Sequence, residues 1–437
     1  MTDARYPIDI STPAVVLKFD PNVMHHGGLG VIRSLGRLGV PVYGVHEDRL
    51  APAASSRYLR GRFLWRPDPA DTERVLSGLA RLSGIIGRPA VLIPTDDAGA
   101  IFLAEHGAAL RSSFLFPDPP PDLPRRLAGK YSLSEVCREF GVASPQTALP
   151  ESLAQAREFA ATTGYPVIAK LTTPWRASGG VRSTQVVADA VELGRIYDAC
   201  ARADAGLMLQ EFVPGGREND WFFHGYCDPN SDCRPAFTGV KVRSYPSSAG
   251  LTSLGRSAPN DELKAEITKL LSRLGYRGNL DLDIRLDARD GRYHLLDFNP
   301  RLGAQFRLFR DTAGTDVALA AYLDLTGQPI PDKAQVEGRT FMVENYDPIS
   351  AIGRFRSGEL GLRPWITSVL FADELAWFAR DDLSPFGLMC LRMGWRAATR
   401  KLPRSSHRSA DGFRYLPTRR RRPTQHPVTP ADRVTTP

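Results

Sequence analysis

Short apolar runs alternate with helix-like stretches over residues 1–115. Consecutive apolar residues predict buried strands at 14–19, 42–45 and 90–94. Residues 31–39 and 71–86 place apolar side chains at helical spacing. Strands separated by helices of this length predict a parallel, doubly wound sheet, which is an α/β domain. The Pro-rich connector 116–124 closes this domain.

After the connector, two helices come first and a run of strands follows. Helices are predicted at 134–140 and 153–163, and strands at 167–170 and 207–212. Four further strands are predicted from WFFHGYC, AFTGVKV, NLDLDIRL and YHLLDFN, between residues 221 and 299. A run of strands after alternating elements is typical of an α+β domain with an antiparallel sheet. Beyond residue 330 the pattern weakens.

The composition is that of a globular protein of two or three domains. The chain has 437 residues, of which 42% are hydrophobic and 24% charged. No apolar run reaches the roughly 18 residues of a membrane span, and the first residues lack the pattern of a signal peptide. We therefore expect a cytoplasmic protein. The five scattered cysteines are expected to be free thiols.

The positive charge is concentrated at the C-terminal end. From Arg396 onward there are eleven basic and two acidic residues, so this segment carries a charge of +9. The whole chain carries +8, so the residues before Arg396 have a net charge of −1. A folded basic face for nucleic acid is not indicated, and no nucleic-acid partner is expected. Residues 401–437 are predicted to be a disordered tail, and deletion of residues 404–437 is expected to leave stability nearly unchanged. Contact of this basic end with a membrane surface is an alternative role.

The segment 278–301 carries the clearest chemistry. Two alternating strands flank the turn DARDG, which predicts a hairpin. Asp281 and Asp283 share a face of the first strand, and Asp297 and Asn299 share a face of the second. Pairing the strands brings these oxygen ligands together in a set suited to Mg²⁺. Arg301 follows in Asn-Pro-Arg and adds a cation.

This segment resembles the ATP-grasp superfamily, and in particular carboxylate–amine ligases such as the D-aspartate ligase-like enzymes. LLDFNPR resembles the family's E-x-N-P-R segment with Asp297 in place of Glu, and RGNLDLD resembles its other metal-bearing strand. The resemblance implies metal ligation by Asp283, Asp297 and Asn299, with Asp281 as the second choice to Asp283. Arg301 is implied to lie near the transferred phosphate.

Further motifs resemble the same family in the same order. Lys130 in AGKYS and Lys170 in GYPVIAK resemble its two nucleotide-binding lysines, and GVKVRSYP implies Lys241 or Arg243 as a catalytic cation. The loop RASGGVRS resembles the glycine-rich loop over the phosphates. LQEFVPG resembles the hinge that reads adenine through its backbone. The loop and hinge residues implied to bind the nucleotide are Ser178, Gly179, Gly180, Gln210, Glu211, Phe212, Val213 and, at the ribose, Glu218.

The resemblance implies an α/β plus α+β fold, with a Rossmann-like domain ahead of a two-lobed ATP-grasp fold built on antiparallel sheets. The implied organisation is a pre-ATP-grasp domain (1–115), a small lobe with lid and glycine-rich loop (116–210), a large lobe with the metal hairpin (211–330), a C-terminal extension (331–400) and the basic tail (401–437). The implied cofactors are ATP and two Mg²⁺ ions, with Mn²⁺ able to substitute.

The implied reaction activates a carboxylate as an acyl phosphate and couples it to an amine, releasing ADP and phosphate. Small-molecule carboxylates and amines, such as amino acids, are the expected substrates. The alternatives are a non-catalytic ATP-binding protein, or a ligase that forms another bond by carboxylation or thioester formation. The chain has no P-loop motif, and HGGLGVIR has Arg33 where a dinucleotide-binding fingerprint has its third glycine. Arg307 and Arg310 are candidates for anchoring a substrate carboxylate.

Overall fold

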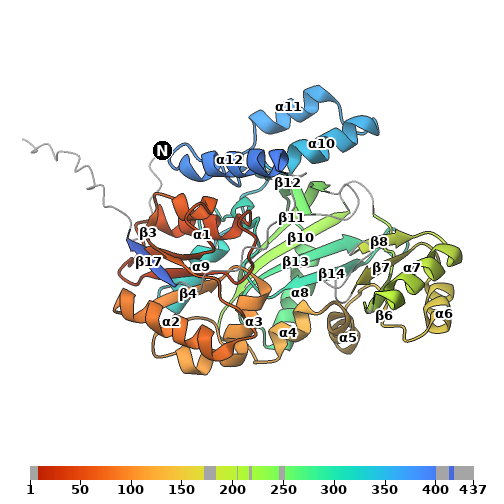
Figure 1. The fold of residues 1–437 in the computed structure, drawn as a ribbon, viewed down its shortest axis with the longest axis horizontal. Coiled ribbons are helices and arrows are strands. Elements are labelled where there is room, and N and C mark those ends of the chain that lie inside the picture. Colours follow the sequence, from red (N-terminus) through yellow and green to blue (C-terminus); the bar gives the residue numbers. More distant parts are fainter. Residues whose placement is uncertain are drawn as a thin grey trace, which may run out of the picture.

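The computed structural model describes residues 8–171, 184–203, 205–215, 219–245, 251–399 and 413–417. Within these residues the strands form three sheets, one mainly parallel and two mainly antiparallel (Figure 1). This is the mixture of α/β and α+β architecture that the sequence predicts.

The N-terminal sheet is parallel except at one edge. In sheet order its strands are β17 (Arg414–Pro417), β3 (Leu59–Leu64), β2 (Val42–His46), β1 (Ala14–Leu17), β4 (Ala90–Pro94) and β5 (Phe114–Leu115). Its helices are α1 (Gly27–Gly36), α2 (Thr72–Ile86) and α3 (Asp97–His106). Val16 packs with α1 on one face, whereas Val15 and Leu17 pack with α2 and α3 on the other. Both faces are covered, as apolar strands in a parallel sheet require.

The small-lobe sheet is entirely antiparallel. Its order is β6 (Thr147–Ala148), β9 (Leu207–Glu211), β7 (Val167–Leu171) and β8 (Thr184–Val187). Two helices, α6 (Leu153–Thr163) and α7 (Ala190–Arg202), pack on it through Ala156 and Leu193. Ser152 and Asp189 cap these helices by accepting backbone N–H groups. The chain reaches this lobe through α4 (Leu123–Ala128) and α5 (Lys130–Phe140).

The large-lobe sheet contains the predicted hairpin. Its order is β14 (Tyr293–Asn299), β13 (Gly278–Leu286), β10 (Asp220–Cys227), β11 (Cys233–Tyr245), β12 (Leu251–Ser257), β15 (Thr340–Met342) and β16 (Glu374–Leu375). On one face Phe223 packs with α8 (Asp261–Leu274), and on the other Phe222 shares a core with α1 and α9 (Val317–Leu325). The N-terminal sheet and the large lobe are therefore joined by one continuous hydrophobic core.

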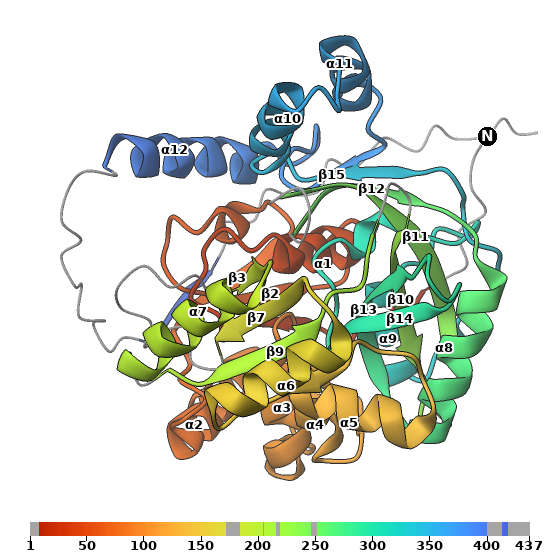
Figure 2. The same cartoon turned by 90° about the vertical axis from the view of Figure 1, so that its right-hand side faces the viewer.

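Residues 331–400 differ from the predicted separate extension, because β15 and β16 extend the large-lobe sheet. Trp377 is fully buried in the core shared with α1. Nearby, Arg33 Nε and Asp382 Oδ2 form a fully buried ion pair of 3.0 Å. The remaining helices α10 (Asp347–Arg356), α11 (Leu362–Leu370) and α12 (Ser384–Ala398) lie together on one side of the molecule (Figures 1 and 2).

The prediction of a disordered tail is wrong for residues 414–417. They form β17, which pairs antiparallel with β3. Phe413 and Tyr415 stack on Phe63, with ring centroids 5.6 and 5.1 Å away, and Arg81 lies 4.6 Å above the ring of Phe413. These tilted ring contacts provide apolar burial that favours the ordered strand.

All five cysteines are free thiols, as predicted. Among the described helices, none is long and apolar enough to cross a bilayer.

Candidate active site

The β13–β14 hairpin places four polar side chains on one face. Asp283 lies directly opposite Asp297, and Asp281 opposite Asn299. Directly opposed residues of antiparallel strands project to the same side of the sheet. The structure thus brings together the residues whose alternation predicted a shared face. The intervening Leu280 and Leu282 are fully buried in the core on the opposite face.

Lysines from three other elements converge on this face. Lys130, the first residue of α5, forms an ion pair with Asp297. Lys241, on β11, places its Nζ 2.7 Å from Asp283 Oδ1. Burial disfavours the Lys241 ammonium, but Asp283 outweighs this effect and raises the pKa of Lys241.

Lys170 lies on β7 of the small lobe, across from the hairpin. Its Nζ donates a 2.8 Å hydrogen bond to Oε1 of Gln210 on the neighbouring β9. Burial, followed by repulsion from Lys130, lowers the pKa of Lys170 to about 8, while Asp297 opposes the shift. The electrostatic effects of Lys130 and Asp297 on this lysine show that small lobe and hairpin face one site.

Arg301 connects the hairpin to the N-terminal sheet. Its Nη1 lies 2.8 Å from Asp281 Oδ2, and its Nε lies 3.3 Å from Oδ1 of Asp97, the first residue of α3. Burial disfavours the charged guanidinium, but Asp281 and Asp97 outweigh this effect and raise the pKa of Arg301. Burial also raises the pKa of Asp97, against the opposing attraction of Arg301. The two carboxylates hold this arginine in a fixed position.

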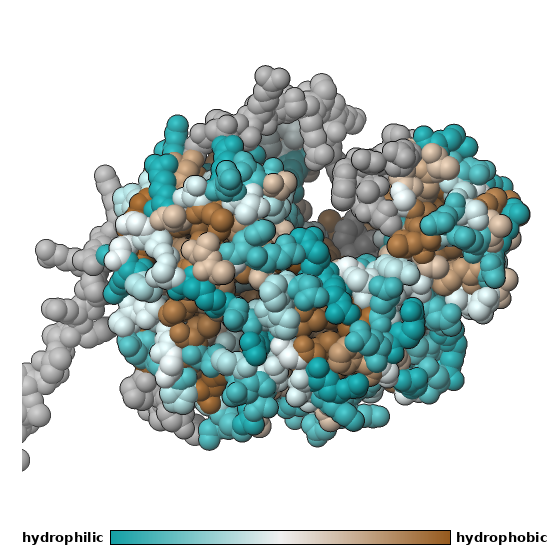
Figure 3. Space-filling model, turned by 90° about the horizontal axis from the view of Figure 1, so that it is seen from below, coloured by the Kyte–Doolittle hydropathy of each residue, from teal (hydrophilic) through white to brown (hydrophobic). Residues whose placement is uncertain are grey.

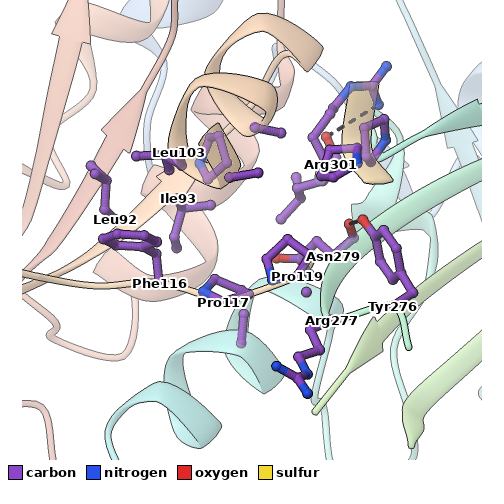
Figure 4. Close-up of a pocket in the computed structure, with 18 of the residues that line it drawn as sticks. Leu92, Ile93, Leu103, Phe116, Pro117, Pro119, Tyr276, Arg277, Asn279 and Arg301 are labelled. Atoms are coloured by element: carbon purple, nitrogen blue, oxygen red, sulfur yellow. Dashed lines mark hydrogen bonds between the residues drawn. The ribbon is translucent and has the colours of Figure 1, made fainter. Parts of the chain in front are cut away.

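A small apolar pocket lies beside Arg301, between α3 and β13. Leu92, Ile93, Leu103 and Phe116 lie on one side of it, and Tyr276, Arg277 and Asn279 on the other (Figure 4). Arg301 forms part of its edge. Apolar surroundings strengthen the ion pairs of Arg301, because less water screens them.

His224 and Gly303 complete the surroundings of Asp281, and sequence reasoning missed both. The fully buried His224 lies on β10 opposite Asp281, with its Nε2 3.2 Å from Asp281 Oδ1. Burial lowers the pKa of His224 and favours the neutral ring. A Cβ at residue 303 would meet His224 and lie 2.7 Å from Asp281 Oδ2. The glycine therefore leaves room for the carboxylate, which only the folded structure shows.

The predicted hinge leaves β9 toward the large lobe. Gln210 Nε2 donates to Thr147 Oγ1 at 3.3 Å, in addition to its bond with Lys170. The Glu211 carboxylate accepts from Arg289 Nη2 at 2.7 Å. The Val213 carbonyl accepts from Arg285 Nη1 at 3.0 Å. Gln210 and Glu211 thus use their side chains inside the protein. Adenine recognition by the backbone of 211–213, including Phe212, stays a prediction.

Several predicted residues lie outside the described residues. These are Ser178, Gly179 and Gly180 of the glycine-rich loop and Glu218 of the hinge. Their roles stay predictions.

The two arginines that follow the hairpin are placed differently from Arg301. Arg307 is buried against α1 and forms an ion pair with Glu374, and burial lowers its pKa. Arg310 is exposed and lines, together with Arg307, a second pocket between α1 and α9. Anchoring of a substrate carboxylate by Arg307 or Arg310 stays a prediction.

The two cations of the GVKVRSYP strand form different ion pairs. Arg243 is buried and binds Asp347 through two hydrogen bonds of 2.8 and 3.0 Å, on the side of α10. Lys241 faces Asp283. Of these two cations, only Lys241 contacts the hairpin carboxylates.

At the hairpin tip, Asp287, Asp290 and His294 gather as a separate group of potential metal ligands. However, Arg289 Nε lies 3.0 and 2.9 Å from the two Asp287 oxygens, and its Nη2 reaches Glu211. Asp290 Oδ2 lies 3.0 Å from His294 Nε2. These charges are satisfied within the turn, so we interpret the group as one that fixes the turn and connects it to β9.

The residues predicted to hold a metal fit a divalent cation. Asp283 and Asp297 each contact a lysine ammonium, so both positions already attract positive charge. Asn299 Nδ2 donates to the Asp281 carbonyl at 3.1 Å, which keeps Asn299 Oδ1 as an oxygen donor. Carboxylate and amide oxygens are the donors that Mg²⁺ prefers.

In the space-filling view a hollow separates the small lobe from the rest of the molecule (Figure 3).

Comparison with known proteins shows what the chain is similar to. No protein-family model matches it. A D-aspartate ligase of Enterococcus faecium is 26% identical over 273 residues, which are 59% of this chain and 64% of that protein. A carbamoyl phosphate synthase large chain of Deinococcus radiodurans is 25% identical over 231 residues, which are 50% of this chain and 22% of that protein. The chain thus spans less than two thirds of these relatives.

Solved structures share the fold at low identity. N5-carboxyaminoimidazole synthetase from Staphylococcus aureus, complexed with ADP, has a TM-score of 0.55 and 11% identity, covering 76% of this chain and 81% of that chain. The biotin carboxylase domain of Hydrogenobacter thermophilus 2-oxoglutarate carboxylase, in complex with MgADP and bicarbonate, has a TM-score of 0.53 and 16% identity, covering 74% and 72%. These comparisons confirm the predicted resemblance to the ATP-grasp superfamily.

Proposed function

Since the chain shares the ATP-grasp fold and resembles D-aspartate ligase, we propose that it is an ADP-forming carboxylate–amine ligase. In this reaction a carboxylate oxygen takes the γ-phosphoryl group of ATP. The amine of a second substrate then displaces phosphate from the acyl phosphate and forms an amide or peptide bond. Amino acids are the proposed substrates.

One observation carries the proposal: four cations from four elements meet three carboxylates on the hairpin face. Lys130 contacts Asp297, Lys241 contacts Asp283 and Arg301 contacts Asp281, while Lys170 faces them from the small lobe. The triphosphate of a nucleoside triphosphate is a polyanion that such a set of cations can bind. Nucleotide binding would let Lys130 and Lys241 exchange their carboxylates for phosphate oxygens.

Asp283, Asp297 and Asn299 would then hold Mg²⁺, for which we propose two ions, with Mn²⁺ able to replace them. When bound, the metal supplies charge neutralisation at the phosphate oxygens. The lysines and the metal would use the same carboxylates at different stages, which explains why each carboxylate contacts a lysine in this structure.

The protein's own part in catalysis is to hold charge where charge develops. Arg301 is fixed by Asp281 and Asp97, so it needs little reorganisation to stabilise the transferring phosphoryl group. Lys241, fixed by Asp283, serves the same purpose from β11. Lys130 and Lys170 bind the nucleotide phosphates from either side of the cleft. No covalent attachment to the protein is required.

The hinge and the glycine-rich loop are proposed to bind the remaining parts of the nucleotide. We propose that the backbone of residues 211–213 binds adenine, that Glu218 binds the ribose, and that Ser178, Gly179 and Gly180 cover the phosphates. Closure of this loop would protect the acyl phosphate from water.

A second candidate reaction uses bicarbonate as the activated carboxylate. It is favoured by the fold shared with a biotin carboxylase domain that binds MgADP and bicarbonate. The amine ligase is preferred because D-aspartate ligase matches a larger share of this chain, and of its own length, than the carbamoyl phosphate synthase large chain.

The proposal is tested by ADP release with a panel of amino acids, taken singly and in pairs, with bicarbonate as a separate arm. Hydroxylamine traps acyl phosphates as hydroxamates, and product masses identify the bond. We expect ADP release that needs a carboxylate and Mg²⁺, and an amide product in the presence of an amine. ADP release with bicarbonate alone would favour the second candidate. Absence of ADP release in all arms, with ATP still bound, would indicate a non-catalytic protein.

A further inference from the structure

Helix α11 buries none of its residues and presents an apolar stripe to solvent. Leu362, Ile366, Val369 and Leu370 are all exposed and lie at positions i, i+4, i+7 and i+8 of one helical face. Leu370 is 71% exposed, and the following Phe371 is 76% exposed. Soluble proteins seldom leave apolar side chains grouped in this way without a partner.

Polar contacts on another face hold α11 in place. Trp365 Nε1 donates to Asp347 Oδ2 at 2.9 Å, and Ser368 Oγ accepts from Arg243 Nη2 at 2.9 Å. Asp347 and Arg243 are themselves buried and form an ion pair. The helix is therefore a fixed part of the fold, and its apolar stripe is a permanent feature of the surface.

Helix α12 repeats the arrangement. Leu391 and Trp395, one turn apart, are 70% and 72% exposed. Pro385 and Met389 bury the opposite face, and Met389 reaches the core shared with α1. Both helices lie on the same side of the molecule in the two ribbon views, away from the small lobe (Figures 1 and 2). The exposed apolar residues of α11 and α12 together are named here the apolar face.

The charges around the apolar face are unbalanced. In the described part of the chain, Arg356, Arg363, Arg380 and Arg396 are exposed and form no ion pair. Four acidic residues of the same region form ion pairs with the protein body: Asp347 with Arg243, Glu374 with Arg307, Asp381 with Arg37 and Asp382 with Arg33. Asp373 is exposed and accepts hydrogen bonds from Thr340. Four exposed arginines against this one aspartate leave the surface beside the apolar face net positive.

We propose that α11 and α12 dock the protein on the surface of an anionic lipid bilayer. Helices with an apolar stripe flanked by arginines bind in the interface plane, with apolar side chains among the acyl chains and cations at the headgroups. The sequence from Arg396 onward adds charge of the same sign, with eleven basic and two acidic residues. A bilayer offers acyl chains to the apolar face and anionic headgroups to the surrounding arginines. This proposal does not depend on the ligase activity.

The test is cosedimentation of the full chain with vesicles of phosphatidylcholine alone or mixed with phosphatidylglycerol. We expect binding to the anionic vesicles that weakens as salt is raised, because headgroup attraction is screened. The double variant Leu370→Ser/Trp395→Ser should weaken binding about ten-fold or more through lost apolar burial. Arg356→Gln and Arg363→Gln should each weaken it on the order of five-fold.

Matched controls come from the small lobe. Val191 is 65% exposed and Arg195 is exposed, both on α7, so Val191→Ser and Arg195→Gln should leave vesicle binding unchanged. The proposal is overturned if the chain ignores anionic vesicles, binds phosphatidylcholine equally well, or binds equally after the double substitution. Sedimentation velocity on the same proteins tests whether a second copy of the chain binds the apolar face instead. A dimer that Leu370→Ser/Trp395→Ser dissociates, without vesicle binding, would assign the face to a second copy.

Discussion

The β13–β14 hairpin and the region of helices α10–α12 differ in whether their charged side chains form ion pairs. On the hairpin, Asp281, Asp283 and Asp297 each contact a cation that lies outside the two strands. Around α10–α12, Arg356, Arg363, Arg380 and Arg396 are exposed and form no ion pair within the described residues, beside exposed Leu and Trp side chains. Burying charge is costly unless it is paired, so a converging set of paired charges indicates a site for a small, highly charged ligand. Unpaired charge on an open surface suits an extended partner.

The largest effect is expected from removing a carboxylate of the hairpin. Asp297→Ala should lower turnover about 100-fold or more, because the metal and Lys130 lose their shared partner. The fold should persist, since Asp297 and Lys130 are partly exposed. Steady-state ADP release and thermal melting measure the two properties separately.

Asp290→Ala is the matched control for Asp297→Ala. Asp290 is also a carboxylate of the same hairpin, but it lies at the tip and bonds His294. It should leave turnover within about two-fold of the wild type, since an exposed pair contributes little. If Asp297→Ala retained full turnover in Mg²⁺, the assignment of the metal site would be wrong.

A smaller effect is expected where the hairpin packs most closely. Gly303→Ala introduces a Cβ 2.7 Å from Asp281 Oδ2 and in contact with His224. Asp281 must shift, and Arg301 with it, so turnover should fall about ten-fold or more by misplacing a catalytic cation. The matched control Gly353→Ala, on α10, adds a Cβ to open space and should not change turnover. Equal turnover in both variants would show that the Asp281–Arg301 pair tolerates displacement.

The third effect is a pH dependence. Lys170 has its pKa lowered to about 8 by burial and by Lys130, so its ammonium is nearly complete at about pH 7 and half lost at about pH 8. As pH rises through 8 the cation is lost, and kcat/KM for ATP should fall about ten-fold for each further pH unit. Lys170→Arg keeps its charge throughout this range and should flatten the profile. An unchanged profile in Lys170→Arg would assign the titration to another group.

Much of the fold could be predicted because local patterns determine it. The strands β1, β2 and β4 are continuous apolar runs, and the hairpin follows from its period-two alternation. The pieces β15 and β16 could not be found, because strands of three and two residues carry no periodicity and depend on β12 for pairing. Their membership of the large-lobe sheet is a property of the tertiary structure.

The candidate site was predictable where a motif carried it and not where distant contacts did. Asp297 and Lys130 stand in recognisable segments, and the structure pairs them. Asp97 contacts Arg301 from the start of helix α3, 204 residues earlier in the chain, with no spacing that would reveal it. The ion pair of Arg307 with Glu374 likewise joins distant segments, and no sequence pattern reveals it.

The smallest effect concerns the basic C-terminal end, where Phe413 and Tyr415, unlike the exposed Leu370 and Trp395, pack against another aromatic ring. β17 pairs with β3 at the edge of the N-terminal sheet and packs Phe413 and Tyr415 on Phe63. Deleting residues 413–437 should therefore cost about 2 kcal/mol from lost aromatic burial and lower Tm by a few degrees. Turnover should stay unchanged, because β17 lies at the sheet edge remote from β1 and β4.

Deleting only residues 418–437 separates the two parts of the tail. It removes Arg419, Arg420, Arg421, Arg422 and Arg433 but keeps β17, so Tm should equal that of the full chain. The double variant Phe413→Ala/Tyr415→Ala in the full chain should reproduce most of the loss seen on deleting 413–437, because it removes the same ring contacts without shortening the chain. If both deletions and the double variant melt with the full chain, the aromatic contacts contribute no net stability. β17 would then be an edge strand whose ordering cost cancels its packing.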